Sequence, residues 1–350
     1  MYKKRLEKLI ATIPANATLI LSPENLYYFS GFTGGEGLLY IDKSRLILFT
    51  DSRYTHQARG EAPDFEIIDT AKLSVSEFLK SKGDMAYGFE DDYVTFSKFA
   101  GLKRISPKSV FTPVSSNIDS IRMIKDEYEL SLIKKAAQIA DSAFSYIIDK
   151  IHPGKTERDI SLDLEYFMLK SGADGLSFDT ISASGVRSCM PHGTATDKVI
   201  ENGDFLTLDF GCKYRGYCSD MTRTVVVGKA SERQKEIYHT VQEAQKAALA
   251  TVRAGELAKA VDEAARGVLE NAGYGKNFGH GLGHSLGLKV HESPSCSPKS
   301  GDILCENMMM TIEPGIYIDD FGGVRIEDLV CVTKDGYENY TTSNKELLEL

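Results

Sequence analysis

The chain has 350 residues, which is enough for two average domains with a large core that needs no disulfides. Apolar residues make up 42% and charged residues 26%, a composition typical of globular proteins that excludes the disordered and fibrous classes. The net charge of -9 argues against nucleic acid as the main partner, because such partners require a basic surface.

The cysteines and the N-terminus indicate the compartment. None of the six cysteines forms a C-x-x-C pair or has zinc-finger spacing, so we expect free, mostly buried thiols in a reducing compartment. The first residues include lysines and arginine but no long apolar stretch, so no signal peptide is expected. No run of about 18 apolar residues predicts a membrane span. These features predict a cytoplasmic protein without a membrane partner.

The N-terminal third alternates short apolar runs with amphipathic stretches. Such alternation predicts an α/β domain. Helices are expected over residues 1–12 and 73–80. Strands are expected over residues 17–22, 37–41, 45–50 and 65–69. The polar segment 115–120 is interpreted as a turn and as the domain boundary, which predicts domains of residues 1–120 and 121–350.

The second domain is predicted to contain two similar halves. Capping-box patterns at Asp126 and Ser231 predict that a helix begins at each. Further helices are expected over residues 156–170 and 256–271. Apolar strands follow each helix pair, over residues 179–185, 205–214, 216–228, 308–318 and 323–333. The same order at nearly the same spacing suggests an internal duplication.

Four acidic residues stand inside these apolar strands. Asp209 and Asp220 flank a turn, and their odd separation places both carboxylates on one face of a hairpin. Glu313 and Glu327 occupy equivalent strands of the second half, whereas Asp328 is expected to be solvated. Buried carboxylates this close together require a counter-charge, a shared proton or solvent.

Four of the seven histidines lie in Pro- or Gly-rich stretches, which favours a functional role over a structural one. They are His192, His280, His284 and His291. Glycines around the last three make a helix unlikely. Four carboxylates balance two divalent cations, and oxygen-rich ligation with an imidazole suits manganese, cobalt, iron or zinc, with manganese our first choice. Two ions roughly 3.5–4 Å apart can hold a bridging water and lower its pKa towards about 7.

With these motifs in this order, the chain resembles the pita-bread metallopeptidases, specifically their Xaa-Pro aminopeptidase and Xaa-Pro dipeptidase branch. The resemblance covers nearly all of the chain and implies an α+β protein. It would have an N-terminal α/β creatinase-like domain and a C-terminal pita-bread catalytic domain. It also implies peptide substrates with proline at the second position and a homodimer or larger homo-oligomer.

The resemblance implies a role for each acidic residue. Asp209 would bind one metal ion, and Asp220 and Glu327 would bridge the two ions. His284 and Glu313 would complete the second metal site. Glu313 would also transfer a proton from the nucleophilic water to the leaving proline nitrogen.

The remaining roles concern the substrate and the surroundings of the metal site. His291 would stabilise the tetrahedral oxyanion. His192 and His280 would shape the proline side of the pocket, and Arg325 would hold Asp209 in place.

Several members of this family remain open as alternatives. The segment 292–299 has no arginine to hold the free carboxylate of a dipeptide, although Lys299 is not excluded. This favours an aminopeptidase, with the Xaa-Pro dipeptidase as the alternative. Methionine aminopeptidase and creatinase fit the motifs less well. A non-catalytic peptide-binding module would have lost metal ligands, and all five are present.

Overall fold

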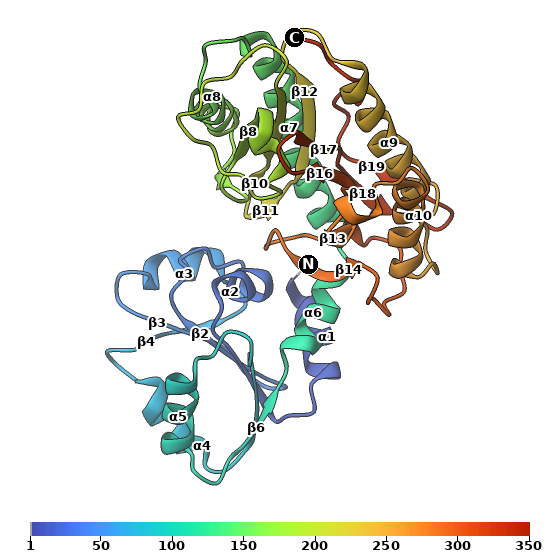
Figure 1. Ribbon diagram of the computed structural model, residues 1–350. Coiled ribbons are helices and arrows are strands. Elements are labelled where there is room, and N and C mark those ends of the chain that lie inside the picture. The colour runs from blue at the N-terminus through green and yellow to red at the C-terminus, as the bar shows by residue number, and fades with distance from the viewer. Residues whose placement is uncertain (1) are drawn as a thin grey trace. The chain divides into compact units, whose positions relative to one another are not determined.

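In the computed structural model, which describes residues 2–350, the chain forms two compact units that divide between Arg122 and Met123 (Figure 1). Each unit has its own buried core. No helix within the described range is long and apolar enough to cross a membrane.

The N-terminal unit is built on a six-stranded mixed sheet in the order β4-β3-β2-β1-β5-β6. The strands are β1 (Ala17–Ile20), β2 (Leu38–Asp42), β3 (Leu46–Thr50), β4 (Glu66–Asp69), β5 (Ala86–Phe89) and β6 (Val110–Pro113). The helices are α1 (Tyr2–Thr12), α2 (Pro23–Ser30), α3 (Thr55–Glu61), α4 (Val75–Lys82), α5 (Phe96–Ile105) and α6 (Ser115–Met123). The four expected strands and both expected helices are present, whereas β5, β6, α2, α3, α5 and α6 were not predicted.

The interpretation of segment 115–120 as a turn was wrong, because it forms the first two turns of α6. Ile118 and Ile121 are buried at helical spacing after the buried Val114. Burial of this apolar stripe outweighs the weak helix propensity of the serines and asparagine in the segment.

The C-terminal unit repeats a pair of helices followed by strands. Its helices are α7 (Glu127–Ile147), α8 (Glu157–Lys170), α9 (Glu232–Leu249) and α10 (Ala258–Asn271), with short 3-10 turns η1 (Ile148–Lys150), η2 (Gly185–Cys189) and η3 (Gly275–Asn277). Its strands are β7 (Gly175–Leu176), β8 (Ile181–Ser184), β9 (Phe205–Phe210), β10 (Cys212–Tyr214), β11 (Tyr217–Cys218), β12 (Met221–Val226), β13 (Gly283–Ser285), β14 (Glu292–Cys296), β15 (Met309–Ile312), β16 (Gly315–Ile318), β17 (Gly322–Arg325), β18 (Asp328–Val332) and β19 (Tyr337–Asn339). Capping boxes begin α7 at Asp126 and α9 at Ser231, as predicted.

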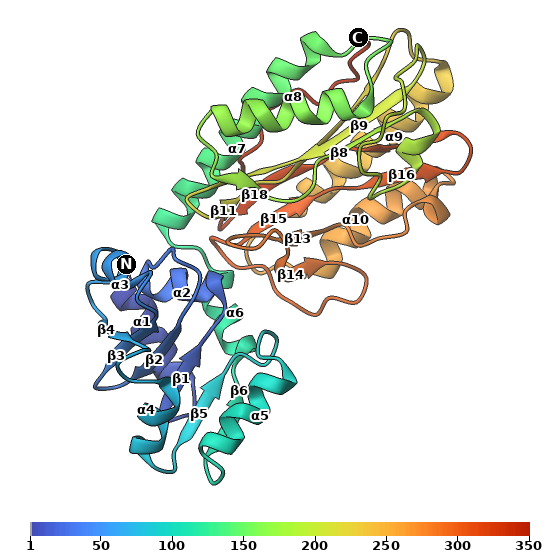
Figure 2. The ribbon, with the colours of Figure 1, turned by 90° about the vertical axis from the view of Figure 1, so that its left-hand side faces the viewer.

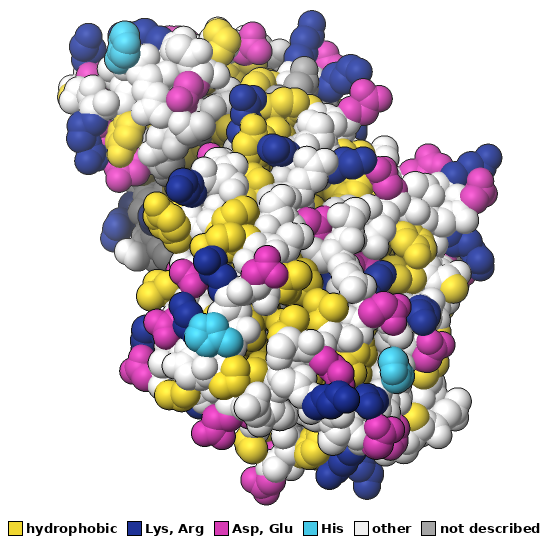
Figure 3. Space-filling model, turned by 90° about the horizontal axis from the view of Figure 1, so that it is seen from above, with side chains coloured by type: hydrophobic (Ala, Val, Ile, Leu, Met, Phe, Trp, Pro, Cys, Tyr) yellow, Lys and Arg dark blue, Asp and Glu magenta, His cyan; other side chains and the backbone are white. Residues whose placement is uncertain are grey.

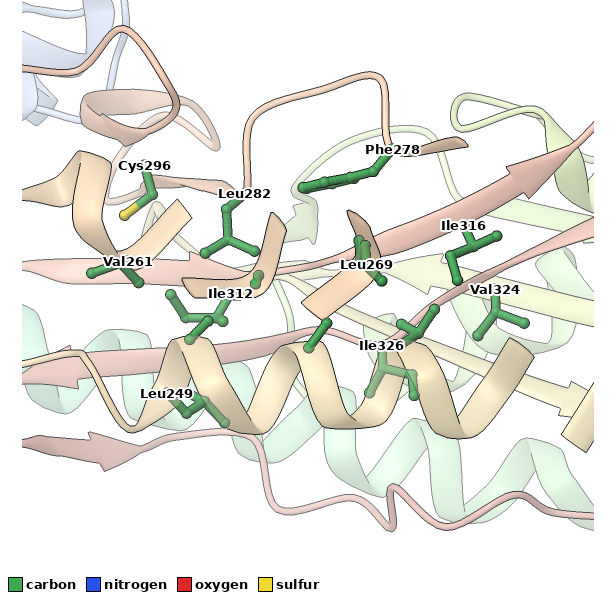
Figure 4. Close-up of a cluster of buried hydrophobic side chains, with 14 of the residues drawn as sticks. Leu249, Val261, Leu269, Phe278, Leu282, Cys296, Ile312, Ile316, Val324 and Ile326 are labelled. Atoms are coloured by element: carbon green, nitrogen blue, oxygen red, sulfur yellow. The ribbon is translucent and has the colours of Figure 1, made fainter. Parts of the chain in front are cut away.

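The two helix pairs cover opposite sides of the strands (Figure 2). Helices α7 and α8 pack with β9 and β12 around one buried cluster, whereas α9 and α10 pack on β15 to β18 around another. In the second cluster, Leu249 and Leu269 lie against Ile312 and Ile326 of the strand region (Figure 4). Helices therefore pack against the strands on both sides, and the strands carry the polar residues described below. This α+β architecture confirms the predicted fold class.

The surface of the molecule mixes both signs of charge. Figure 3 shows lysine and arginine side chains beside aspartate and glutamate side chains across the face that it presents. Exposed ion pairs also occur on helix α9, between Lys235 and Glu232 and between Lys246 and Glu243. That face offers no broad basic patch of the kind that nucleic acid binding requires.

Candidate metal centre and active site

Asp209 and Asp220 lie where a long hairpin changes from one sheet to the next. A two-residue loop at Arg215 and Gly216 joins β10 to β11, and the same register continues into β9 and β12. Asp209 pairs with Thr222, so the two carboxylates are diagonal neighbours on one face rather than direct partners.

Gly211 allows the two chain segments of the hairpin to approach each other closely near the two carboxylates. A Cβ atom at Gly211 would lie 2.0 Å from the carbonyl oxygen of Ser219, on the opposite strand. A side chain there would push the two strands apart, and with them the two carboxylates.

Glu313 and Glu327 come from the equivalent hairpin of the second half. Glu313 lies between β15 and β16, and Glu327 lies between β17 and β18. The pairs Ile312–Asp328 and Gly315–Arg325 share one register, which places Glu313 opposite Glu327. The backbone N–H of Glu327 donates to the carbonyl oxygen of Thr222 at 3.1 Å, which joins this hairpin to the first one.

His284 reaches the acidic residues from β13. Its Nε2 atom lies 3.4 Å from a carboxylate oxygen of Glu313 and 3.7 Å from one of Asp220. Its Nδ1 atom lies 3.0 Å from the carbonyl oxygen of Ser285, an acceptor that requires the proton to be on Nδ1. Burial lowers the pKa of His284 to about 4, so the ring is neutral at pH 7 and its Nε2 lone pair faces two carboxylates.

The cluster has an excess of buried negative charge. One oxygen each of Asp209, Asp220 and Glu327 lie within 4.8 Å of one another. Oδ1 of Asp209 and Oε1 of Glu327 are buried and accept no hydrogen bond within residues 2–350. Burial raises the pKa of Asp220 well above its usual value, and the charge of Glu327 raises it further. Burial also raises the pKa of Glu313 to about 7.

These observations fit divalent cations. Unsatisfied carboxylate oxygens and a lone pair directed at them are unfavourable in a buried site without a positive charge. Hard oxygen donors with one imidazole are the ligand set of manganese, zinc or related ions. The second nitrogen of the imidazole is fixed by a backbone carbonyl, as is usual for a histidine that binds a metal.

A buried polar network surrounds the acidic residues. The Arg325 guanidinium donates to Asp209 at 2.6 Å from Nη2, to Thr222 at 3.1 Å from Nε and to Tyr317 at 2.8 Å from Nη1. The hydroxyl of Thr222 in turn donates to Glu327 at 2.7 Å. The predicted contact between Arg325 and Asp209 is therefore present, but as one part of a larger network.

The predicted histidines line the cavity in front of the acidic residues, which has a volume of about 540 Å³. The rings of His284 and His291 are 4.4 Å apart between centroids. His280 lies 3.0 Å from the Tyr317 hydroxyl through Nε2, and burial lowers its pKa to about 4. His192 lines the same cavity and is exposed to it.

Three polar residues of the site were missed in the sequence, and one acidic residue was misjudged. Thr222, Thr311 and Tyr317 make hydrogen bonds that orient Glu327, Glu313 and Arg325 respectively. The sequence Thr-Leu-Asp at 207–209 recurs as Thr-Ile-Glu at 311–313, and this repeat could have indicated Thr311.

The expectation that Asp328 is solvated was wrong. The residue is fully buried, and its carboxylate accepts hydrogen bonds from Arg223 at 2.9 Å and from Thr341 at 3.0 Å. Asp328 is thus a paired core residue that adjoins the site without being part of it.

Fold and site together define a hydrolytic metalloenzyme. The family model described as "Metallopeptidase family M24" matches residues 131–334, and the one described as "Creatinase/Prolidase N-terminal domain" matches residues 3–124. The chain belongs to metallopeptidase family M24 and is a hydrolase that requires divalent metal ions.

Relatives match along the full length of the chain. An Xaa-Pro dipeptidase of Pyrococcus furiosus is 40% identical, over 99% of this chain and 100% of its own. The structure of an Xaa-Pro dipeptidase from Bacillus anthracis is 42% identical with a TM-score of 0.96, covering 100% of both chains. That of an X-Pro aminopeptidase from Thermotoga maritima is 40% identical with a TM-score of 0.92, covering 99% of this chain and 100% of its own. The resemblance to pita-bread peptidases, and the fold it implied, are thereby confirmed.

Proposed function

We propose that this protein is an Xaa-Pro dipeptidase that uses two divalent metal ions, manganese being the first candidate. The observation that carries the proposal is the buried group of carboxylates with unsatisfied oxygens, joined by the Nε2 atom of His284. Relatives named Xaa-Pro dipeptidase match over nearly the whole chain. They favour the dipeptidase over the aminopeptidase that sequence motifs alone had placed first.

Five side chains would hold the ions. They are Asp209, Asp220, His284, Glu313 and Glu327. The four carboxylates would balance the four positive charges of two divalent cations, and the pKa values of Asp220, Glu313 and Glu327 are raised without such cations. Bound ions of this kind polarise the scissile carbonyl and lower the pKa of the attacking water.

Glu313 is suited to carry the proton. Its carboxylate lines the cavity, where it would take a proton from the attacking water and pass it to the proline nitrogen. The Thr311 hydroxyl donates to Glu313 at 3.0 Å and fixes its orientation. His291, exposed in the same cavity beside His284, is placed to donate a hydrogen bond to the developing oxyanion.

The cavity suits a bond that precedes proline. That bond is a tertiary amide without an N–H, so selection has to come from the shape of the leaving group. His192, His280 and Pro191 line the cavity together with Phe178 and Ile181 and offer flat or apolar surfaces to a proline ring. His280 is neutral near pH 7 and is oriented by the Tyr317 hydroxyl, so it would present an uncharged imidazole to the proline ring.

An Xaa-Pro aminopeptidase remains the second candidate, because of the charges in the cavity. Arg325 is the only lysine or arginine among the described residues that line it, and its guanidinium already pairs with Asp209. Lys299 is exposed and does not line the cavity. A longer peptide needs no cation to hold its C-terminus there, and a similar structure is that of an X-Pro aminopeptidase.

Parallel assays with Ala-Pro, Ala-Pro-Ala and Ala-Ala on manganese-loaded protein test the proposal, with product release followed by mass spectrometry. Faster cleavage of Ala-Pro than of Ala-Pro-Ala, with no cleavage of Ala-Ala, supports the dipeptidase. Equal or faster cleavage of the tripeptide transfers the assignment to the aminopeptidase. A folded, metal-loaded protein that cleaves none of the three with manganese, cobalt or zinc would instead be a peptide-binding module.

A further inference from the structure

A fully buried lysine contacts the strand pair β13 and β14 next to two histidines of the site. The Lys125 side chain is 1% exposed, and its Nζ atom lies 3.1 Å from the hydroxyl of Ser285 and 3.4 Å from a carboxylate oxygen of Glu292. The Glu292 side chain is itself 8% exposed. The Lys125 backbone N–H donates to the carbonyl oxygen of Asn307 at 3.0 Å, so the lysine is anchored at both ends.

Two of the groups that Lys125 Nζ contacts belong to the chain neighbours of site histidines. Ser285 follows His284, and Glu292 follows His291. Ser285 pairs with Glu292 across β13 and β14, directly after a register shift between His284 and Ser285. Ser285 and Glu292 are therefore cross-strand partners, and each is next along the chain to a histidine that lines the cavity.

The same carboxylate also holds the loop between the two strands. Oε1 of Glu292 accepts a hydrogen bond from the backbone N–H of Lys289 at 3.1 Å. A Cβ atom at Gly287 would lie 2.7 Å from Oε2 of Glu292, so the loop closes tightly over the carboxylate. The buried ion pair therefore lies directly beside the register shift of this strand pair.

We propose that Lys125 is a positioning residue of the active site. Its ion pair with Glu292 and its hydrogen bond to Ser285 fix the shifted pairing of β13 with β14. That pairing sets the orientation of His284 towards Glu313 and Asp220 and the 4.4 Å separation of the His284 and His291 rings. The catalytic part of this inference rests on the proposed function, whereas the effect on metal binding does not require a particular substrate.

The test compares Lys125→Met, Glu292→Gln and the double variant Lys125→Met/Glu292→Met with the wild-type protein. Lys198→Met is the control for loss of a lysine away from the cavity: Lys198 also contacts a serine hydroxyl and a carboxylate, Ser184 at 2.9 Å and Asp204 at 2.7 Å, but is 29% exposed. The readouts are the dissociation constant for manganese, from competition with a chelating dye, the thermal midpoint, and kcat and KM for Ala-Pro.

Lys125→Met is expected to weaken manganese binding and to lower kcat by about tenfold each, with KM changed less than kcat, as for other residues that orient metal ligands. The double variant is expected to regain thermal stability, because an apolar pair can replace a buried ion pair, without regaining metal affinity or kcat. Lys198→Met is expected to change only the thermal midpoint.

Wild-type manganese affinity and kcat in the double variant, or losses no larger than those of Lys198→Met, would overturn the proposal. If Lys125→Met does not fold, Glu292→Gln and the double variant decide in the same way. If the wild-type protein cleaves no Xaa-Pro peptide, the proposed function fails, but the manganese affinities still confirm or refute the role of Lys125.

Discussion

Replacing Thr222 by valine removes one hydroxyl from the centre of the polar network and leaves the shape of the side chain almost unchanged. That hydroxyl donates to the Glu327 carboxylate at 2.7 Å and accepts from Nε of Arg325 at 3.1 Å, and Thr222 is fully buried. Since Oε1 of Glu327 already has no hydrogen-bond partner, the variant leaves both oxygens of this carboxylate unsatisfied in the metal-free protein.

The magnitude follows from the two hydrogen bonds that are lost. The bond from the charged Arg325 contributes about 1.5–3 kcal/mol and the bond to Glu327, whose pKa is raised, about 1 kcal/mol, so losing both is expected to cost the metal-free protein about 3 kcal/mol of unfolding free energy. Thr207→Val is the matched control, because Thr207 is buried in the same sheet and its nearest hydroxyl partner is the neutral Thr224 at 3.1 Å. Its expected cost is about 1 kcal/mol.

Urea unfolding of the metal-free variants and competition for manganese with a chelating dye provide the measurements. We expect Thr222→Val to bind manganese about tenfold more weakly than the wild-type protein and Thr207→Val to bind it normally. Equal losses of stability and of manganese affinity in the two variants would refute the view that Thr222 orients Glu327.

Three further predictions concern charge and packing at the site. The pKa of His280 falls from an ordinary 6.5 to about 4, so its contribution to stability is complete above pH 6.5 and is lost as the pH falls towards 4. His280→Gln should reduce this acid sensitivity by up to about 3 kcal/mol in urea titrations at pH 7 and pH 4.5, and an unchanged pH dependence would contradict the shift. Asp220→Asn should abolish activity yet raise the thermal midpoint of the metal-free protein at pH 7.5 by about 3 °C, because it removes one buried repelling carboxylate; a lower midpoint would count against the repulsion. Gly211→Ala should lower both the thermal midpoint and the metal affinity, because its Cβ would lie 2.0 Å from the Ser219 carbonyl oxygen. Normal metal affinity would show that the close approach at Gly211 does not determine the positions of Asp209 and Asp220.

The sequence predicted those parts of the site whose signal lies in a single segment. Asp209 and Glu313 are conspicuous because a carboxylate is out of place between apolar strand residues. The capping boxes at Asp126 and Ser231 each predict the start of a helix from a pattern of only four residues, and both helix starts were confirmed. The catalytic and metal-binding roles of the individual residues remain predictions.

Features that depend on distant partners could not be predicted in this way. The role of Thr222 depends on Arg325 and Glu327, more than 100 positions further along the chain. Lys125 reaches Glu292 across 167 positions, and a single lysine at the start of a helix region otherwise indicates a solvated side chain. Asp328 was misjudged for the same reason, because its partner Arg223 comes from the other half of the unit.

We propose that the buried carboxylates and His284 form a two-metal site that cleaves Xaa-Pro bonds. The most direct test strips the protein of metal with a chelator, titrates it with manganese and follows release of proline from Ala-Pro. We expect no release from the stripped protein and a rate that rises with added manganese and saturates at two ions per chain. Proline release that persists after stripping, or a folded protein that binds manganese without releasing proline, would contradict it.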